Sequence, residues 1–209
     1  VTLIRLSGEG SIACCDAVFE GLKPLRAVAT HTIHYGVIKD KDRVIDDVLV
    51  AVFRAPHSYT GEDSVEISAH GSQYIVTEII ELLCRNGARL AEPGEFSARA
   101  FAAGRIDLSQ AEAVADIIAA DSKAAHTMAA TQMRGGYSDE LNTLRESLIE
   151  IVALLELELD FAEEDVVFAD RSRLKSMLEN AILVTDKLMH SFKTGNAIRN
   201  GVSVAIVGA

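Results

Sequence analysis

Strict alternation of apolar and polar residues predicts two short β-strands in the first part of the chain. Residues 2–7 (TLIRLS) place Arg5 on the polar face of one strand, and residues 64–70 place Glu66 on the polar face of another. Two further β-rich segments, joined by a charged connection, predict a hairpin: residues 30–37 and 44–53.

A helical period replaces this alternation after each strand region. Gly71-Ser72 opens a helix whose apolar positions recur every three or four residues, and Asn86-Gly87 closes it with residues typical of a helix C-terminus. Residues 95–102 have helical composition, and Gly104 can adopt the positive φ that ends a helix. Strands and helices together predict a mixed α+β domain.

Helical periodicity alone continues from Ser109. Ser109 and Glu112 have the spacing of a capping box, which predicts the start of an alanine-rich helix that runs to about Arg134. Two longer amphipathic helices are predicted after it, at residues 138–161 and 171–198. These helices predict an all-α bundle.

The patterns divide the chain into an α+β domain over residues 1–108, a helical domain over 109–199 and a final segment, 200–209. The apolar run at 202–207 is typical of a strand buried on both faces of a parallel sheet. Gly208-Ala209 stands where a phosphate-binding loop, GxxxxGK(S/T), would begin, although a simple terminal strand is the alternative.

Charge is distributed unevenly, with a net charge of −11. Residues 138–170 alone hold 11 acidic residues and one basic residue. Such a chain lacks the broad basic face that binds nucleic acid, so an RNA partner would have to use local positive patches or other surfaces.

The cysteines and the apolar runs bear on location. Three cysteines, two of them adjacent at Cys14-Cys15, suit a reducing compartment better than a disulfide framework. No apolar run approaches the roughly 20 residues that span a bilayer. We therefore expect a cytoplasmic protein without a membrane segment, whose true N-terminus precedes Val1.

Three charged residues stand out on short elements of defined direction: Arg5, Glu66 and Arg105. Arginine offers a planar fork of donors, and a carboxylate can accept two N–H groups of a ligand. By spacing alone, ordinary surface ion pairs remain the default interpretation.

Three motifs carry a resemblance to a known family: IRLSG at 4–8, SYTGEDSVEISAHGS at 58–72 and PGEFSARAFAAGRIDLSQAEA at 93–113. In this order they resemble the TrmE/MnmE family of tRNA modification GTPases, and the resemblance extends over essentially the whole chain. It implies a GTPase domain inserted after the helices seen here, followed by a final helical segment.

The resemblance also implies a reduced folate, 5-formyl- or 5,10-methylene-tetrahydrofolate, bound in the N-terminal domain. The matching positions are Arg5, Glu66 and Arg105. Family members usually carry lysine at the third position, so Arg105 keeps the charge but changes reach and fork geometry.

For the whole protein the resemblance implies formation of 5-carboxymethylaminomethyluridine, or a related aminomethyl group, at the wobble uridine of tRNA. GTP, K⁺ and Mg²⁺ would bind in the GTPase domain, which lies outside this sequence. The implied partners are tRNA, a second copy that dimerises through the N-terminal domain, and an FAD-dependent protein of the glucose-inhibited division protein A family.

Two alternatives remain open from the sequence. One is a folate-dependent aminomethyltransferase resembling the glycine-cleavage T protein, which should not continue into a phosphate-binding loop. The other is a non-catalytic dimerisation scaffold, which the long amphipathic helices alone would fit. A GK(S/T) sequence shortly after Gly208 and binding of reduced folate would separate the three interpretations.

Overall fold

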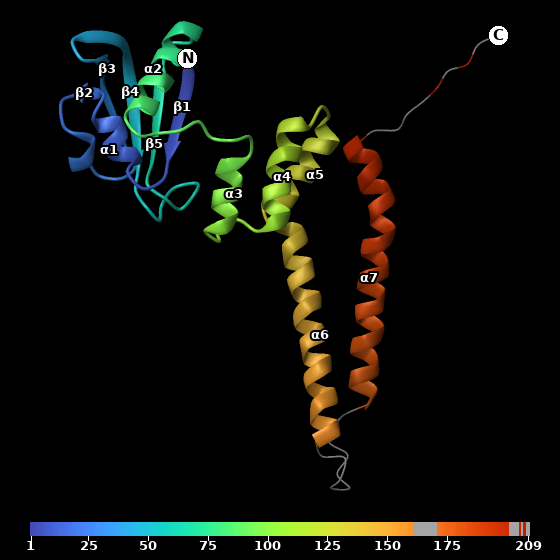
Figure 1. The fold of residues 1–209 in the computed structure, drawn as a ribbon. Coiled ribbons are helices and arrows are strands. Elements are labelled where there is room, and N and C mark those ends of the chain that lie inside the picture. Colours follow the sequence, from blue (N-terminus) through green and yellow to red (C-terminus); the bar gives the residue numbers. More distant parts are fainter. Residues whose placement is uncertain (161–170, 201–204, 206, 208–209) are drawn as a thin grey trace. The chain divides into compact units, whose positions relative to one another are not determined.

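A computed structural model describes residues 1–160 and 171–200 together with residues 205 and 207 (Figure 1). The chain divides into two compact units, Val1–Ile106 and Asp107–Ala209, called here the N-terminal unit and the helical unit. A sheet with helices in the first and helices in the second confirm the predicted fold class. The predicted strand at 202–207 and the glycine at 208 lie largely outside the described residues.

The N-terminal unit is built on one antiparallel sheet of five strands in the order β1-β5-β4-β3-β2. The strands are β1 Thr2–Ser7, β2 Phe19–Gly21, β3 Thr32–Asp40, β4 Arg43–Phe53 and β5 Ser64–Ala69. The hairpin of β3 and β4 is confirmed but is longer than predicted. Its turn is tight because Lys41 adopts a φ of 57°.

Two helices, α1 (Ser11–Asp16) and α2 (Gln73–Arg85), cover one face of this sheet. Apolar side chains that alternate along the strands meet Ile79, Leu82 and Leu83 of α2 in a single buried cluster. The inward direction of the apolar positions of this helix is therefore confirmed, and Ile75, although only partly buried, packs against the same cluster. A 3₁₀ turn, η1 (Leu25–Ala27), and a third helix, α3 (Glu95–Ala102), complete the unit.

The opposite face of the sheet, called here the open face, carries exposed apolar side chains. Cross-strand register aligns them in rows, because residues paired directly in antiparallel strands project on the same side. One row runs through Arg5, Glu66, Ala51 and Ile33, and the next through Leu3, Ser68, Leu49 and Tyr35. Ile33 and Tyr35 are each 68% exposed, and Leu3 and Leu49 about half exposed.

The short edge strand β2 pairs with β3 and contributes one buried aromatic ring. Phe19 is buried and lies against two glycines, Gly21 in its own strand and Gly36 in β3. A Cβ atom at Gly21 would lie 2.6 Å from Phe19 Cε1, and one at Gly36 would lie 2.5 Å from Phe19 Cζ and 2.4 Å from the carbonyl oxygen of Glu20. The two glycines therefore form the slot that the ring occupies.

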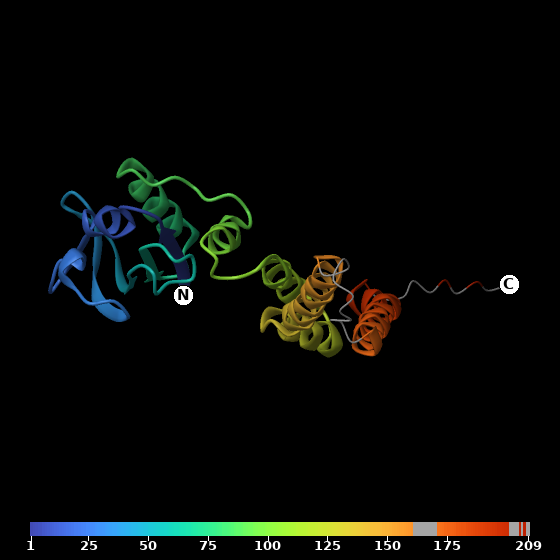
Figure 2. The same ribbon diagram turned by 90° about the horizontal axis from the view of Figure 1, so that it is seen from below.

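The helical unit consists of four described helices: α4 Leu108–Ala119, α5 Lys123–Met133, α6 Gly136–Asp160 and α7 Arg171–Asn200. Helices α4 and α5 pack together, and α6 lies beside α7 (Figures 1 and 2). No helix of the described part is both long and apolar enough to cross a membrane.

The prediction of one helix from Ser109 to Arg134 was wrong, because the chain breaks between α4 and α5. Ser122 begins the second helix, and its hydroxyl accepts a hydrogen bond from the backbone N–H of Ala125 at 3.1 Å. The alanine pairs on both sides, at residues 119–120 and 124–125, continue the helical composition and hid this cap in the sequence.

The capping box was also predicted two residues too late. The Asp107 carboxylate accepts from the backbone N–H of Gln110 at 2.8 Å, and the Gln110 side-chain oxygen accepts from the Asp107 N–H at 2.9 Å. Ser109 lies inside the helix, where its hydroxyl accepts from Gln132. The Ser138 hydroxyl and the Gln110 N–H lower the pKa of Asp107, which favours the charged cap.

Candidate cofactor-binding site

Arg5 and Glu66 form an ion pair across the first two strands of the sheet. The two residues are direct register partners of β1 and β5, so their side chains leave the same face. Arg5 Nε donates to Glu66 Oε1 at 2.7 Å, and Nη2 lies 2.5 Å from the same oxygen. Glu66 Oε2 accepts no hydrogen bond from any residue that the structure describes, so it remains able to accept from a ligand.

The Arg5 guanidinium also contacts helix α3. Its Cζ atom lies 5.7 Å from the centre of the Phe96 ring, a cation–π arrangement. Phe96 was not predicted as part of the site, although it lies within the motif that carried the family resemblance. The contact joins the start of α3 to β1.

Arg105 lies apart from this pair. It follows α3 and Gly104, which has the predicted positive φ of 66°, and its backbone N–H donates to the Ala100 carbonyl at 2.8 Å. Its side chain is exposed, and its stem passes so close to Gly61 that a Cβ atom there would lie 3.4 Å from Arg105 Cγ. Among the described residues no hydrogen bond or ion pair joins Arg105 to Arg5 or Glu66.

A cavity of about 840 Å³ opens beside β1. Arg5 lines it together with apolar side chains of α1 and α2, among them Cys14, Val76 and Leu83. Glu66 instead lines a smaller hollow of about 300 Å³ on the open face, with Leu49 as one of its apolar walls. The larger volume lies within the range that cavities for drug-sized ligands and cofactors occupy.

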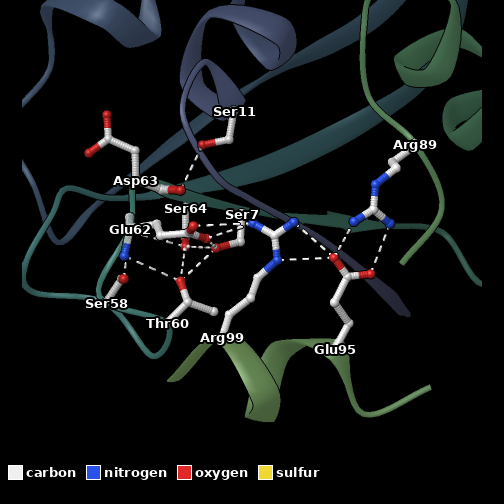
Figure 3. Close-up of polar contacts among 10 residues, drawn as sticks. All are labelled: Ser7, Ser11, Ser58, Thr60, Glu62, Asp63, Ser64, Arg89, Glu95 and Arg99. Atoms are coloured by element: carbon white, nitrogen blue, oxygen red, sulfur yellow. Dashed lines mark hydrogen bonds and ion pairs between the residues drawn. The ribbon is translucent and has the colours of Figure 1, made fainter. Parts of the chain in front are cut away.

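Glu95, the first residue of α3, is the centre of an arginine–glutamate network (Figure 3). Arg89 binds it with two donors at 2.9 and 2.5 Å, Arg99 with two at 3.0 and 2.8 Å, and the Glu92 backbone N–H with one at 2.9 Å. Arg89 first, then the Glu92 N–H and Arg99, lower the pKa of Glu95 to about 2. Glu95 and Arg99 lie four residues apart on α3, the spacing at which oppositely charged side chains meet on one helix face.

A second carboxylate, Glu62, was missed by the sequence analysis. It lies in the turn before β5, where Arg99 Nη1 donates to both of its oxygens at 3.1 Å (Figure 3). The Ser7 hydroxyl donates to Glu62 Oε2 at 3.0 Å and lies 2.6 Å from the Thr60 hydroxyl. A turn residue that pairs only through the tertiary fold leaves no periodic signal in the sequence.

The described residues include no candidate metal site. Within the described ranges, no three His, Cys, Asp or Glu side chains are grouped closely enough to hold an ion.

Comparison with known families agrees with both units. The family model described as "GTP-binding protein TrmE N-terminus" matches residues 1–105, and the one described as "MnmE helical domain" matches residues 108–203. The matches follow one another in the order that the motifs indicated.

Three relatives that align with nearly all of this chain are each named tRNA modification GTPase MnmE. The protein from Cytophaga hutchinsonii is 53% identical over 208 residues, which cover 100% of this chain and 45% of the relative. Those from Flavobacterium johnsoniae and Bacteroides thetaiotaomicron are each 51% identical, covering 100% and 98% of this chain and 45% of each relative. The chain thus spans about half the length of the curated relatives it matches. These matches confirm the resemblance carried by the three motifs, and the chain belongs to the MnmE (TrmE) family of tRNA modification GTPases.

Proposed function

We propose that this chain is the folate-binding and first helical part of a tRNA modification GTPase. The observation that carries the proposal is the Arg5–Glu66 pair: one Glu66 carboxylate oxygen stays available at the 300 Å³ hollow on the open face, while Arg5 lines the 840 Å³ cavity. A reduced folate needs this combination, because its pterin ring offers amino and ring N–H donors while its tail is anionic.

The residues suit such a ligand in different ways. Glu66 Oε2 can accept from the pterin N–H groups, and the ion pair with Arg5 fixes the orientation of the Glu66 carboxylate. Arg105 offers a second guanidinium, exposed and separate from the first, for a carbonyl or the anionic tail.

For the complete protein, the family assignment supports a reaction at the wobble uridine of tRNA that forms 5-carboxymethylaminomethyluridine or a related aminomethyl group. A bound methylene-tetrahydrofolate supplies an electrophilic one-carbon unit. GTP, K⁺ and Mg²⁺ would bind in a domain outside these 209 residues. The FAD-dependent partner of the glucose-inhibited division protein A family would supply the redox chemistry, in the cytoplasm.

The match of residues 108–203 to the MnmE helical domain favours this proposal over an aminomethyltransferase resembling the glycine-cleavage T protein. The names of the relatives also favour an enzyme over a scaffold alone.

Dimerisation through the N-terminal unit fits the open face, where Ile33 and Tyr35 are exposed beside half-exposed Leu3 and Leu49. We expect Ile33→Glu to shift the chain from dimer to monomer in sedimentation equilibrium. Leu22→Glu, at a leucine that is 96% exposed and outside this face, should leave the dimer intact. Equal behaviour of the two variants would exclude the open face as the dimer contact.

Calorimetric titration with 5-formyl-tetrahydrofolate tests the proposal. Loss of a charged hydrogen-bond partner costs about 1.5–3 kcal/mol, so Glu66→Ala should weaken binding roughly ten- to a hundredfold. Arg105→Ala should weaken it less, because its contacts are more exposed. Glu20→Ala, at the carboxylate of the exposed pair with Lys39, is the control and should bind like the wild type. A folded chain that shows no saturable binding would contradict the folate assignment.

A further inference from the structure

Arg99 joins helix α3 to the turn before β5. Its guanidinium lies between two carboxylates, Glu95 on its own helix and Glu62 in the turn. It donates to both oxygens of Glu62 through Nη1 and to Glu95 through Nε and Nη2. A planar fork can satisfy two carboxylates at once in this way, which a lysine ammonium does less well.

Glu62 is in turn fixed to the end of the sheet. Its Oε2 accepts from Ser7, and Ser64 donates to the Ser7 hydroxyl at 3.1 Å. Ser7 and Ser64 are register partners, and they form the next same-face pair along β1 and β5 after Arg5 and Glu66. The Glu62 carboxylate is therefore anchored one step along the strands from the pair proposed to bind folate.

The turn that holds Glu62 also meets Arg105. A Cβ atom at Gly61, the residue before Glu62, would lie 3.3 Å from Ala103 Cβ and 3.4 Å from Arg105 Cγ. The stem of Arg105 thus lies within van der Waals reach of the turn, where the φ of 78° at position 61 favours glycine. At the other end of α3, Phe96 contacts the Arg5 guanidinium. One helix thus touches Arg5 near its start and places Arg105 just after its end.

We infer that Arg99 and Glu62 are positioning residues, whose ion pair sets the distance between Arg105 and the Arg5–Glu66 pair. The inference rests on the proposed folate function, since it names the device that arranges that same site. Without the Arg99–Glu62 contact, α3 keeps its own fold but loses its charged link to the turn, which leaves the Tyr59–Ser97 hydroxyl contact at 3.0 Å as a remaining side-chain hydrogen bond between them. Arg105 and Phe96 then move together relative to the strands.

The alternative is an ordinary surface ion pair. The Arg99 and Glu62 side chains are 34% and 36% exposed, and pairs in such settings contribute about 0–1 kcal/mol to stability. A pair with no positioning role would affect only the unfolding of the unit, to the same extent as a comparable pair elsewhere. Asp40 and Arg85 provide that comparison, because their carboxylate is 32% exposed and their contact distance is 2.9 Å.

The test uses the 209-residue chain with Glu62→Gln, Arg99→Lys and the matched control Asp40→Asn. Two quantities are measured: affinity for 5-formyl-tetrahydrofolate by calorimetry, and backbone amide hydrogen exchange of each variant without ligand. Exchange is compared at the turn, residues 58–62, and at residues 99–105, which comprise the end of α3 and the segment after it. It is also compared in the central strand β4.

The expected result is a roughly three- to tenfold weaker affinity for Glu62→Gln and Arg99→Lys, with the control at the wild-type value. Exchange should accelerate at 58–62 and 99–105 in both variants, and β4 should be unchanged. Unaltered exchange at these two segments would overturn the inference, as would an affinity loss that Asp40→Asn reproduces.

The two proposals fail separately. A wild-type chain that binds no folate rejects the proposed function, while the exchange comparison still decides whether Arg99 and Glu62 hold Arg105 in place. A wild-type chain that binds folate, with variants that neither bind more weakly nor exchange faster, rejects the positioning role alone.

Discussion

The two units of this chain bury their apolar residues to different extents. In the N-terminal unit, strands and helices share one continuous core in which the largest side chains, such as Leu25, Ile38, Ile67 and Ile79, are fully buried. In the described part of the helical unit the buried apolar residues are mostly alanines: Ala113, Ala125, Ala129 and Ala181, together with Ile151. The first unit encloses a core of large apolar side chains, whereas the helices of the second contact one another mainly through small alanine side chains.

The larger apolar residues of the helical unit lie outside. On α6, Leu148 and Val152 are about half exposed, and on α7, Ile182 and Leu183 are 60% and 65% exposed. Amphipathic helices gain most of their stability from packing such faces. We therefore expect the N-terminal unit to be stable by itself and the helical unit to gain stability from a further surface against α6 and α7.

The largest expected difference is in the thermal stability of the two units when each is produced alone. We expect residues 1–106 alone to unfold in one cooperative thermal transition, since they hold the complete core. Residues 107–209 alone should melt broadly or associate in a concentration-dependent way. Circular dichroism melting of both fragments at several concentrations measures this difference. A sharp, concentration-independent transition of the second fragment would contradict the expected difference in stability between the units.

Matched isoleucine substitutions on two helices should give a smaller effect. Ile79 on α2 is fully buried, so Ile79→Ala should lower the free energy of unfolding by about 2–5 kcal/mol. Ile182 on α7 is 60% exposed, so Ile182→Ala should change it by less than about 0.5 kcal/mol. Urea denaturation of both variants measures the difference. A large loss for Ile182→Ala would mean that α7 is already covered in solution, for example in a dimer.

Acid should destabilise the N-terminal unit through Glu95. The folded-state pKa of Glu95 is lowered from 4.5 to about 2, so its network stabilises the folded state above pH 4.5. This contribution is lost as the pH falls from 4.5 toward 2. Glu95→Gln should therefore flatten the pH dependence of stability in that window, as denaturant titrations of the isolated N-terminal unit would show. An unchanged slope would exclude Glu95 as its source.

Local patterns in the sequence predicted elements whose determinants are close in the chain. The strand at Thr2–Ser7, the helix at Glu95–Ala102 and the positive φ of Gly104 follow from alternation, composition and a single glycine. The predicted start of α4 was wrong because two capping boxes overlap in the sequence. The box of Asp107 and Gln110 forms, and the predicted box of Ser109 and Glu112 does not. Local rules identify both boxes but do not rank them.

In the candidate site, the sequence likewise indicated single residues but not the contacts between them. The pairing of Arg5 with Glu66 depends on which strand becomes the neighbour of β1, and no local pattern decides this. Family motifs pointed to both residues, yet the contact itself is a product of the sheet order. Glu62 was missed for the same reason, because its partners Ser7 and Arg99 are far from it in the sequence.

The slot around Phe19 imposes an order on the changes that evolution can make there. A side chain at position 21 conflicts mainly with the Phe19 ring, and its next contact, the Tyr35 carbonyl oxygen at 3.1 Å, needs only a small adjustment. Position 21 can therefore diversify only in lineages where position 19 has first become smaller. Position 36 conflicts with the Glu20 main chain at 2.4 Å, which no change at position 19 removes. Descendants of this sequence should keep glycine at 36 for as long as β2 pairs with β3, whatever becomes of the ring.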